Sequence, residues 1–329
     1  MPVLARCDKM EINNKLQNYI LDMNRKKDNV IEPTAAQGAD TLKFYLKSKP
    51  PKKIFKLNDA ELFVVDVGGV LRDTTELDSK SFEVGFKAVG IDYKFDADAV
   101  WHLKGLGRYK NRKKCIYALL AISDLHKEAE LIDILKKPDA EEFVTALIQD
   151  YIAKKGADAA EKTMQIIYDE YGKFFNSDEG KKLVETISGS QEAMVLLKQK
   201  GYKLALFSNG GRNAVERDVP YYKILDAVIC KEDITKEKPS GEGIIKAAQM
   251  LGVPVEKTVY IGDAIVDIWA SRDAGCKSLI VSDNGMSFPE QIAKEKPEFV
   301  FNNIMEVAYA IKTKQNSKQQ DKNKKIKIY

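Results

Sequence analysis

Histidine and cysteine are both scarce in this chain. Of its 329 residues only two are histidines and four are cysteines. Two histidines leave almost no room for a histidine-based zinc site or for Ser-His-Asp catalysis. The cysteines show no CxxC spacing and no close pairing, so we interpret them as reduced thiols: Cys7, Cys115, Cys230 and Cys276.

Long apolar runs are missing as well. No stretch approaches the roughly 20 apolar residues of a membrane span, and the N-terminus lacks the apolar core of a signal peptide. We therefore expect a cytoplasmic protein that does not enter a membrane. The net charge of +4 is a small excess of 53 basic over 49 acidic residues, much of it in the last residues of the chain. Such a balance argues against a positive electrostatic potential over the whole surface that would bind nucleic acid.

The two ends of the chain are predicted to lie outside the main domain. Apolar residues at helical spacing predict an amphipathic helix over about 9–24, inside an N-terminal extension and linker that spans 1–58. This helix either packs on the main domain or binds a partner. Residues 312–329 are polar and basic and are predicted to form a disordered tail, whose lysines are suited at most to weak contacts with nucleic acid.

Residues 78–185 are predicted to be an all-helical insertion. Apolar stripes at helical spacing recur through this region, for example at Ile116, Leu119 and Leu120, and strand-like runs are scarce. The region interrupts a chain that otherwise alternates between short apolar strands and helices. We therefore expect it to form a separate helical domain.

Short apolar strands alternate with helices after Ile187. They are predicted at 204–207, 227–229, 259–262, 278–281 and 299–301, and an earlier strand ends at Val65. Alternation of this kind implies right-handed βαβ units and a parallel sheet covered on both faces. The sequence predicts an α/β fold with a Rossmann-like parallel sheet, built from residues 59–77 and 186–311.

Two of the strand ends carry a polar residue followed by glycines. The run FVVDVGGVLRD at 63–73 is an apolar strand that leads into Asp66, and open α/β sheets place reacting groups at such strand ends. The strand at 204–207 leads into Ser208 and Asn209, and both could donate hydrogen bonds to a phosphoryl oxygen. Taken alone, each segment also fits an ordinary turn.

Two later segments supply a cation and two carboxylates. Lys238 precedes a proline, which would hold it as a rigidly placed cation, although most lysines of the chain are expected to be solvated. Asp263 follows the strand at 259–262, and Asp267 lies one helical turn later on the same side. Carboxylates gathered in this way repel each other unless a cation lies between them. Oxygen ligands without histidine suit Mg²⁺.

The four segments, in this order, resemble the motifs of the haloacid dehalogenase superfamily. The superfamily pattern is DxDG[TV]L, then a Ser or Thr, then a lysine often in KP, then GDxxxD. The resemblance covers about residues 60–305 and implies a helical cap after the first motif, which matches 78–185. The corresponding residues here are DVGGVL from Asp66 to Leu71, Ser208, Lys238-Pro239 and GDAIVD from Gly262 to Asp267.

The resemblance implies a phosphatase that hydrolyses a small phosphorylated metabolite with Mg²⁺. Asp66 would be the nucleophile and form a phosphoaspartate, while Ser208, Asn209 and Lys238 would hold the phosphoryl oxygens. The metal ligands would be the following: Asp66, the carbonyl of Gly68, Asp263 and, in support, Asp267.

A second part of the resemblance lies in the predicted cap. The run LKGLGR at 103–108 is similar to the cap loop of β-phosphoglucomutase-like members. Lys104 and Arg108 either bind the far end of an anionic substrate or belong to a solvated basic run.

The chain departs from the family pattern at Gly68. Phosphatases of this family usually carry a second Asp there, which protonates the leaving oxygen and activates water, a role worth about 10²–10⁴ in rate. Asp73 is the nearest carboxyl in the sequence that could replace it. A phosphomutase fits less well because it depends on the missing Asp. A dehalogenase fits less well because that branch uses no metal. The alternative from another class is a catalytically impaired binding or regulatory protein on the same fold.

Overall fold

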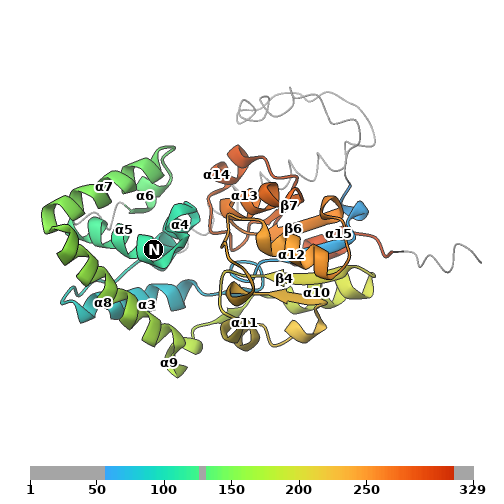
Figure 1. Cartoon of the computed structure of the whole chain (residues 1–329), viewed down its shortest axis with the longest axis horizontal. Coiled ribbons are helices and arrows are strands. Elements are labelled where there is room, and N and C mark those ends of the chain that lie inside the picture. Colours follow the sequence, from blue (N-terminus) through green and yellow to red (C-terminus); the bar gives the residue numbers. More distant parts are fainter. Residues whose placement is uncertain (1–55, 126–130, 315–329) are drawn as a thin grey trace, which may run out of the picture. The chain divides into compact units, whose positions relative to one another are not determined.

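The structure is a computed structural model that describes residues 56–125 and 131–314 (Figure 1). The chain divides into two compact units, Met1–Ala60 and Glu61–Tyr329. The predicted N-terminal helix and all but the first residues of the predicted tail lie outside the described residues. The sheet, the helices and the candidate site belong to the second unit. Within the described ranges, no helix is both long and apolar enough to cross a membrane.

A six-stranded parallel sheet forms the centre of the second unit, in the order β5-β4-β1-β6-β7-β8. Every predicted strand is present within a residue or so of its expected position. The four residues of β1 are all buried, as expected for a strand covered on both faces. The strands are β1 (Leu62–Val65), β4 (Lys203–Phe207), β5 (Ala227–Ile229), β6 (Thr258–Gly262), β7 (Lys277–Val281) and β8 (Phe299–Phe301).

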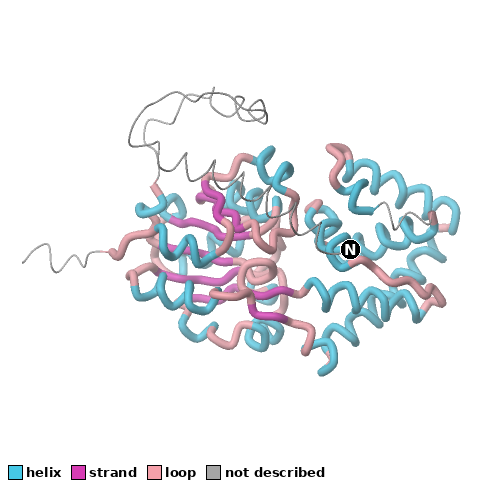
Figure 2. The backbone as a smooth tube through the Cα atoms, turned by 180° about the vertical axis from the view of Figure 1, so that it is seen from behind, coloured by secondary structure: helices cyan, strands magenta, loops and turns pink. Residues whose placement is uncertain are grey.

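Helices cover both faces of this sheet, which confirms the predicted α/β class (Figure 2). Helices α12 and α13 pack on one face, where Ile244 and Ala270 join an apolar cluster with Leu62, Val64 and Phe207. Helix α10 contacts β4 and α15 but contributes nothing to that cluster, so it covers the opposite face. The helices are α10 (Ser190–Gln199), α11 (Arg212–Asp218), α12 (Glu242–Met250), α13 (Ile265–Ala274), α14 (Pro289–Glu295) and α15 (Ile304–Ala310).

Between β1 and β4 the chain forms a run of helices from Thr75 to Lys181. Their apolar side chains form a cluster of their own, drawn from residues 82–171 with Phe288 as the one buried contribution from elsewhere. The helices are α3 (Thr75–Ala88), α4 (Ala97–Gly105), the 3-10 turn η3 (Arg108–Lys110), α5 (Arg112–Asp124), α6 (Leu131–Leu135), α7 (Ala140–Lys155), α8 (Ala157–Asn176) and α9 (Asp178–Lys181).

A short antiparallel ribbon joins this helical segment to the sheet. Strand β2 (Arg72–Asp73) pairs with β3 (Glu185–Thr186). The segments that enter and leave the helical run therefore lie side by side. Two-residue strands carry no readable periodicity, and the sequence did not predict them. The ribbon keeps the first motif beside the point at which the helices begin.

Candidate active site

The polar residues of the first, second and fourth motifs follow three neighbouring strands. Strand β1 pairs in parallel with β4 on one side and with β6 on the other, with Val65 opposite Leu206 and Ile261. The residues that follow these strands therefore meet at one edge of the sheet. Asp66 lies in the middle of this edge, between the turn after β4 and the turn after β6.

Three carboxylates gather at this edge. Oxygen atoms of Asp66, Asp263 and Asp267 all lie within 4.8 Å of one another, and the three residues are 3%, 0% and 0% exposed. Asp267 holds the turn at the start of α13, because its Oδ2 accepts the backbone N–H of Asp263 at 3.2 Å and of Ala264 at 3.1 Å. The predicted convergence of these carboxylates is thus present in the geometry.

Lys238 connects two of the carboxylates. Its Nζ lies 2.7 Å from Oδ2 of Asp66 and 2.9 Å from Oδ1 of Asp267, and its side chain is only 1% exposed. The same Nζ donates to the hydroxyl of Tyr260 at 2.8 Å. Lys238 therefore supplies one positive charge from the sheet side of the site.

Two carboxyl groups of the cluster have pKa values shifted in opposite directions. Burial alone would raise the pKa of Asp267, but the positive charges of Lys238 and Lys110 hold it below its ordinary value. For Asp263, burial raises the pKa to about 8 against the opposing effect of Lys110, and the charges of Asp267 and Asp66 add to the rise. Asp263 therefore lacks a cation of its own.

The donor set fits a hard divalent cation. Oδ1 of Asp263 is buried and has no hydrogen-bond partner among the described residues, whereas Oδ2 accepts the N–H of Met286 at 2.9 Å. A buried carboxylate oxygen without a partner is costly. Three carboxylates with no histidine among them are the type of ligand set that Mg²⁺ prefers.

The two glycines of the first motif differ in their surroundings. A Cβ at Gly69 would lie 2.2 Å from Oδ2 of Asp263, and Gly69 has a φ of +74°, so only glycine lets the first motif approach the fourth this closely. A Cβ at Gly68 would meet nothing nearer than the Trp101 ring at 4.0 Å. The backbone therefore has room for a Cβ at the position where the family pattern places a second Asp. Asp73 is engaged elsewhere, since its Oδ1 accepts the N–H of Thr75 at 2.8 Å.

Ser208 and Asn209 lie in the turn after β4. Ser208 is 6% exposed, and its Oγ accepts the N–H of Gly210 at 3.0 Å. Oδ1 of Asn209 accepts the N–H of Lys238 at 3.0 Å, which ties the second motif to the third. The roles of both residues toward a substrate stay predictions.

The two predicted cap residues are paired within the helical segment. Nζ of Lys104 lies 2.5 Å from Oδ2 of Asp78, and Tyr171 also donates to this carboxylate. Nε of Arg108 lies 2.8 Å from Oε1 of Glu141. The geometry does not bring either cation to the carboxylate cluster. A role for them in substrate binding stays a prediction.

A lysine that the sequence did not single out does reach the cluster. Nζ of Lys110, at the end of η3, lies 3.6 Å from Oδ2 of Asp66, and its side chain is 21% exposed. Burial would lower the pKa of Lys110, but the carboxylates of Asp267, Asp66 and Asp263 raise it above its ordinary value. Lys110 lies in a basic run, 108–114, in which no single residue stands out by pattern.

The loop around Met286 contacts the helical segment beside the site. His102 Nδ1 lies 3.0 Å from the carbonyl of Met286, and Ser287 Oγ donates to the carbonyl of Gly105 at 2.7 Å. A Cβ at Gly105 would lie 2.0 Å from the Met286 carbonyl oxygen. Because the backbone N–H of Met286 also donates to Asp263, the same loop contacts both the helices and the carboxylate cluster.

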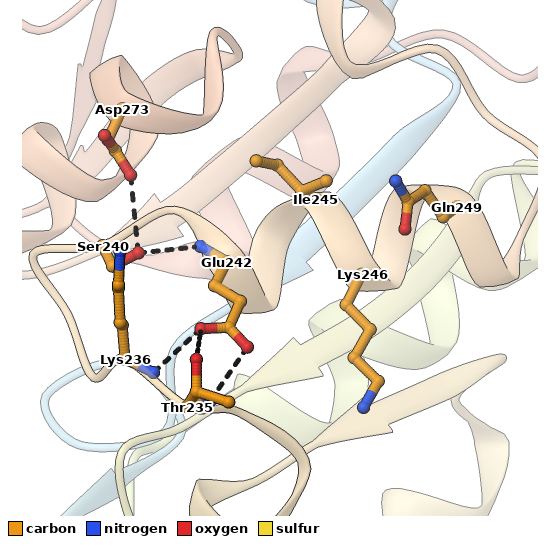
Figure 3. Close-up of a pocket in the computed structure, with 8 residues that line it drawn as sticks. All are labelled: Thr235, Lys236, Ser240, Glu242, Ile245, Lys246, Gln249 and Asp273. Atoms are coloured by element: carbon orange, nitrogen blue, oxygen red, sulfur yellow. Dashed lines mark hydrogen bonds between the residues drawn. The ribbon is translucent and has the colours of Figure 1, made fainter.

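A surface pocket beside α12 is lined in part by Thr235, Lys236 and Ser240, which precede and follow Lys238 in the sequence (Figure 3). The Glu242 carboxylate accepts the N–H groups of Thr235 at 2.9 Å and of Lys236 at 2.8 Å, and Gly241 donates to Asp273 at 2.7 Å. None of the carboxylates of the cluster lines this pocket. We interpret these contacts as the anchor of the Lys238 loop on α12 and α13.

Comparison with known proteins identifies the family. A family model described as haloacid dehalogenase-like hydrolase matches residues 110–281, more than half of the chain. The chain belongs to the haloacid dehalogenase-like hydrolase family. The match includes Lys110, Ser208, Lys238 and both carboxylates of the fourth motif, and it begins after Asp66.

Two curated relatives of this family member are named as pyrophosphatases. A candidate pyrophosphatase PpaX of Caldanaerobacter subterraneus is 30% identical over 125 residues, which are 37% of this chain and 56% of that protein. The pyrophosphatase PpaX of Bacillus cereus is 28% identical over 177 residues, which are 52% of this chain and 78% of that protein. The chain thus spans about half the length of the first relative and about three quarters of the second.

The solved structures support the fold. A candidate phosphoglycolate phosphatase from Lactobacillus delbrueckii superposes with a TM-score of 0.57 at 20% identity, covering 78% of this chain and 99% of that protein. At this identity the likeness concerns the fold alone. It agrees with the haloacid dehalogenase-like assignment and with the observed parallel sheet.

Proposed function

We propose that this haloacid dehalogenase-like protein is a Mg²⁺-dependent phosphatase that acts on a small phosphorylated metabolite through a phosphoaspartate on Asp66. The observation that carries the proposal is the arrangement around Oδ2 of Asp66. Oδ2 lies 2.7 Å from Nζ of Lys238, and an oxygen of Asp66 lies within 4.8 Å of oxygens of two further carboxylates. Phosphoryl transfer through a covalent intermediate requires a carboxylate nucleophile, a cation that binds the phosphate, and carboxylates that can hold a metal ion.

The residues of the cluster have separate roles in this proposal. Asp66, Asp263 and the carbonyl of Gly68 would hold Mg²⁺, with Asp267 in support. The ion, when bound, would neutralise charge on the phosphoryl oxygens and on the carboxylates. Lys238, the hydroxyl of Ser208 and the N–H of Asn209 would orient the phosphoryl group, so that its phosphorus faces Asp66.

The chemistry of the chain's own residues then takes two steps. An oxygen of Asp66 forms a bond to phosphorus while the bond to the leaving oxygen breaks. Water afterwards attacks the phosphorus of the phosphoaspartate, which releases phosphate and restores the Asp66 carboxylate.

Gly68 favours substrates with a good leaving group. The usual proton donor is absent from this position, and Oδ1 of Asp73 accepts the N–H of Thr75 at 2.8 Å. An acyl, anomeric or phosphate leaving group needs a proton least. The pyrophosphatase names of the relatives support the same direction, because one phosphate is the leaving group when pyrophosphate is cleaved.

Gly68 also favours a second candidate function. A binding or regulatory protein that has lost catalysis would retain the fold and dispense with the acid. The buried network around Asp66, Lys238 and Asp267 supports the enzyme, because a site without catalysis has no need to keep three carboxylates and a lysine buried together.

Phosphate release from a panel of compounds tests the proposal. The panel contains pyrophosphate, acetyl phosphate, sugar phosphates and nucleoside phosphates, each measured with Mg²⁺ and with a chelator. We expect Mg²⁺-dependent release by the wild type that vanishes in Asp66→Asn. Equal inertness of the wild type and Asp66→Asn on every compound would replace the phosphatase with the binding protein.

A further inference from the structure

Two lysines approach the same oxygen of Asp66 from different parts of the chain. Lys238 lies 2.7 Å from Oδ2 of Asp66 and Lys110 lies 3.6 Å from it. Lys238 comes from the loop before α12 and is fixed by Asp267 and Tyr260. Lys110 comes from η3, between α4 and α5 of the helical segment. A phosphoryl group seated against Asp66 therefore has a cation from the sheet and a second cation from the helices.

The position of Lys110 is built by local structure. Asn111, the residue after Lys110, caps α5 by accepting the N–H of Lys114 at 3.3 Å, and the helix begins at Arg112. Gly107 precedes η3 with a φ of +79°, and a Cβ there would lie 2.9 Å from the Trp269 ring. The turn that carries Lys110 is thus packed against α13, the helix that begins between Asp263 and Asp267.

The missing proton donor at Gly68 and the cation of Lys110 bear on the same step, the departure of the leaving group. The family pattern places at Gly68 the carboxyl that protonates the leaving oxygen, and a Cβ there would meet nothing nearer than the Trp101 ring at 4.0 Å. In its absence, a leaving group has to depart as an anion. The leaving oxygen departs on the side of phosphorus opposite Asp66, and an ammonium group that enters the site from the helical segment is suited to stabilise that anion.

We propose that Lys110 is a catalytic residue that stabilises the leaving group as an unprotonated anion, in an enzyme that lacks a proton donor at Gly68 and therefore cleaves pyrophosphate and acyl phosphates in preference to alkyl phosphate esters. This inference rests on the proposed phosphatase function. It assigns to a residue of the helical segment the task that a carboxyl beside Asp66 otherwise performs. Substrate selection then follows from the acidity of the leaving group as well as from its shape.

The step balances without a general acid. An Asp66 oxygen bonds to phosphorus, the bond from phosphorus to the bridging oxygen breaks, and its electron pair stays on the departing phosphate or carboxylate beside Lys110. Water then attacks the phosphorus of the phosphoaspartate and restores the Asp66 carboxylate. For pyrophosphate, the two protons of that water end on the two phosphate products through the solvent.

Leaving-group dependence tests the proposal. Values of kcat/KM are measured for pyrophosphate, acetyl phosphate, 4-nitrophenyl phosphate, phenyl phosphate and glycerol 2-phosphate, with wild type, Lys110→Gln and Lys110→Arg. Lys113→Gln is the matched control, because Lys113 lies in the same basic run and bonds to Gln165 on the surface. Asp66→Asn reports whether any turnover passes through the nucleophile.

We expect Lys110→Gln to lose about 10²–10³ in kcat/KM on pyrophosphate and acetyl phosphate, the usual effect of removing one group that stabilises a developing anion. Lys110→Arg should recover most of this loss, and Lys113→Gln should match the wild type. The loss should grow from acetyl phosphate through 4-nitrophenyl phosphate to phenyl phosphate, because a less acidic leaving group depends more on a cation that stabilises its anion. We expect the wild type to cleave glycerol 2-phosphate poorly. Calorimetry should show weaker binding of inorganic phosphate to Lys110→Gln, independently of turnover.

Two outcomes would overturn the inference. If Lys110→Gln lowers kcat/KM for all five substrates by the same factor, or for none of them, Lys110 does not act on the leaving group. The proposed phosphatase function still stands in that case, as long as Asp66→Asn is inactive. If no compound is cleaved in an Asp66-dependent way, the proposed function fails and the inference fails with it. Thermal denaturation of each variant identifies any loss that comes from misfolding.

Discussion

Removal of the Asp263 carboxylate should make the metal-free protein more stable at neutral pH. Burial raises the pKa of Asp263 from 3.8 to about 8, and its Oδ1 has no hydrogen-bond partner among the described residues. A carboxyl whose pKa is higher in the folded than in the unfolded chain favours folding most below pH 4. That stabilisation is lost as the pH rises to about 8, because the folded state must then hold a buried charge.

The size of the effect follows from the pKa. Each pH unit between the two pKa values changes the free energy of unfolding by about 1.4 kcal/mol, so the loss between pH 5 and pH 8 is at most about 4 kcal/mol. At about 2–4 °C for each kcal/mol in a domain of this size, Tm should fall by roughly 10 °C. The lowered pKa of Asp267 acts only below about pH 4, and the raised pKa of Lys110 acts only at alkaline pH, so neither masks this window.

Thermal denaturation in a chelator, from pH 5 to pH 8, compares the wild type with Asp263→Asn. The amide keeps an acceptor for the N–H of Met286 and removes the charge. We expect the wild-type Tm to fall toward pH 8 more steeply than that of the variant. Mg²⁺ should restore the wild type at pH 8 and leave the variant unchanged, since a ligand that binds the folded state stabilises it. Parallel curves for the two proteins, with or without Mg²⁺, would refute the reasoning.

Two glycine substitutions test the close approaches in the site, with Gly90→Ala as the control because Gly90 has a φ of +80° and no atom within 4 Å of an added Cβ. Gly69→Ala should lose more than about 3 kcal/mol in urea denaturation, against about 1 kcal/mol for the control, because its methyl group collides with Asp263; equal losses would show that only the backbone angle matters. Gly105→Ala should lower kcat/KM for phosphate release at least tenfold by pushing α4 away from the Met286 carbonyl, and an unchanged rate would mean that this contact does not hold the helices over the site.

The fold could be predicted from the sequence because the strands are short apolar runs bounded by turns. All six strands of the sheet match such runs, and the helical segment between β1 and β4 matches the region of helical periodicity. The two-residue strands β2 and β3 escaped prediction, since two residues define no period. The predicted N-terminal helix lies outside the described residues and stays a prediction.

Residues of the candidate site could be predicted where a polar residue directly follows a strand. Asp66 and Asp263 each come directly after a buried strand, and the parallel register brings them together. Residues of the helical segment were harder to assign. The sequence pointed to Lys104 and Arg108, which the geometry pairs with Asp78 and Glu141.

Lys110 could not be recognised from the sequence. It stands in a basic run, and only the turn between α4 and α5 directs it toward Asp66. A single lysine of such a run is selected by tertiary packing, which periodicity and local pattern do not report. The same holds for the buried pair of Lys104 and Asp78, which joins the consecutive helices α3 and α4.

Trapping the covalent intermediate tests the central claim most directly. The wild type is mixed with pyrophosphate or acetyl phosphate and Mg²⁺, quenched in acid after milliseconds, digested and analysed by mass spectrometry. The account predicts a peptide that contains Asp66 and carries the mass of one added phosphoryl group, absent in Asp66→Asn. Rapid phosphate release without such a peptide, or a phosphoryl group on another residue, would contradict the assignment of Asp66 as the nucleophile.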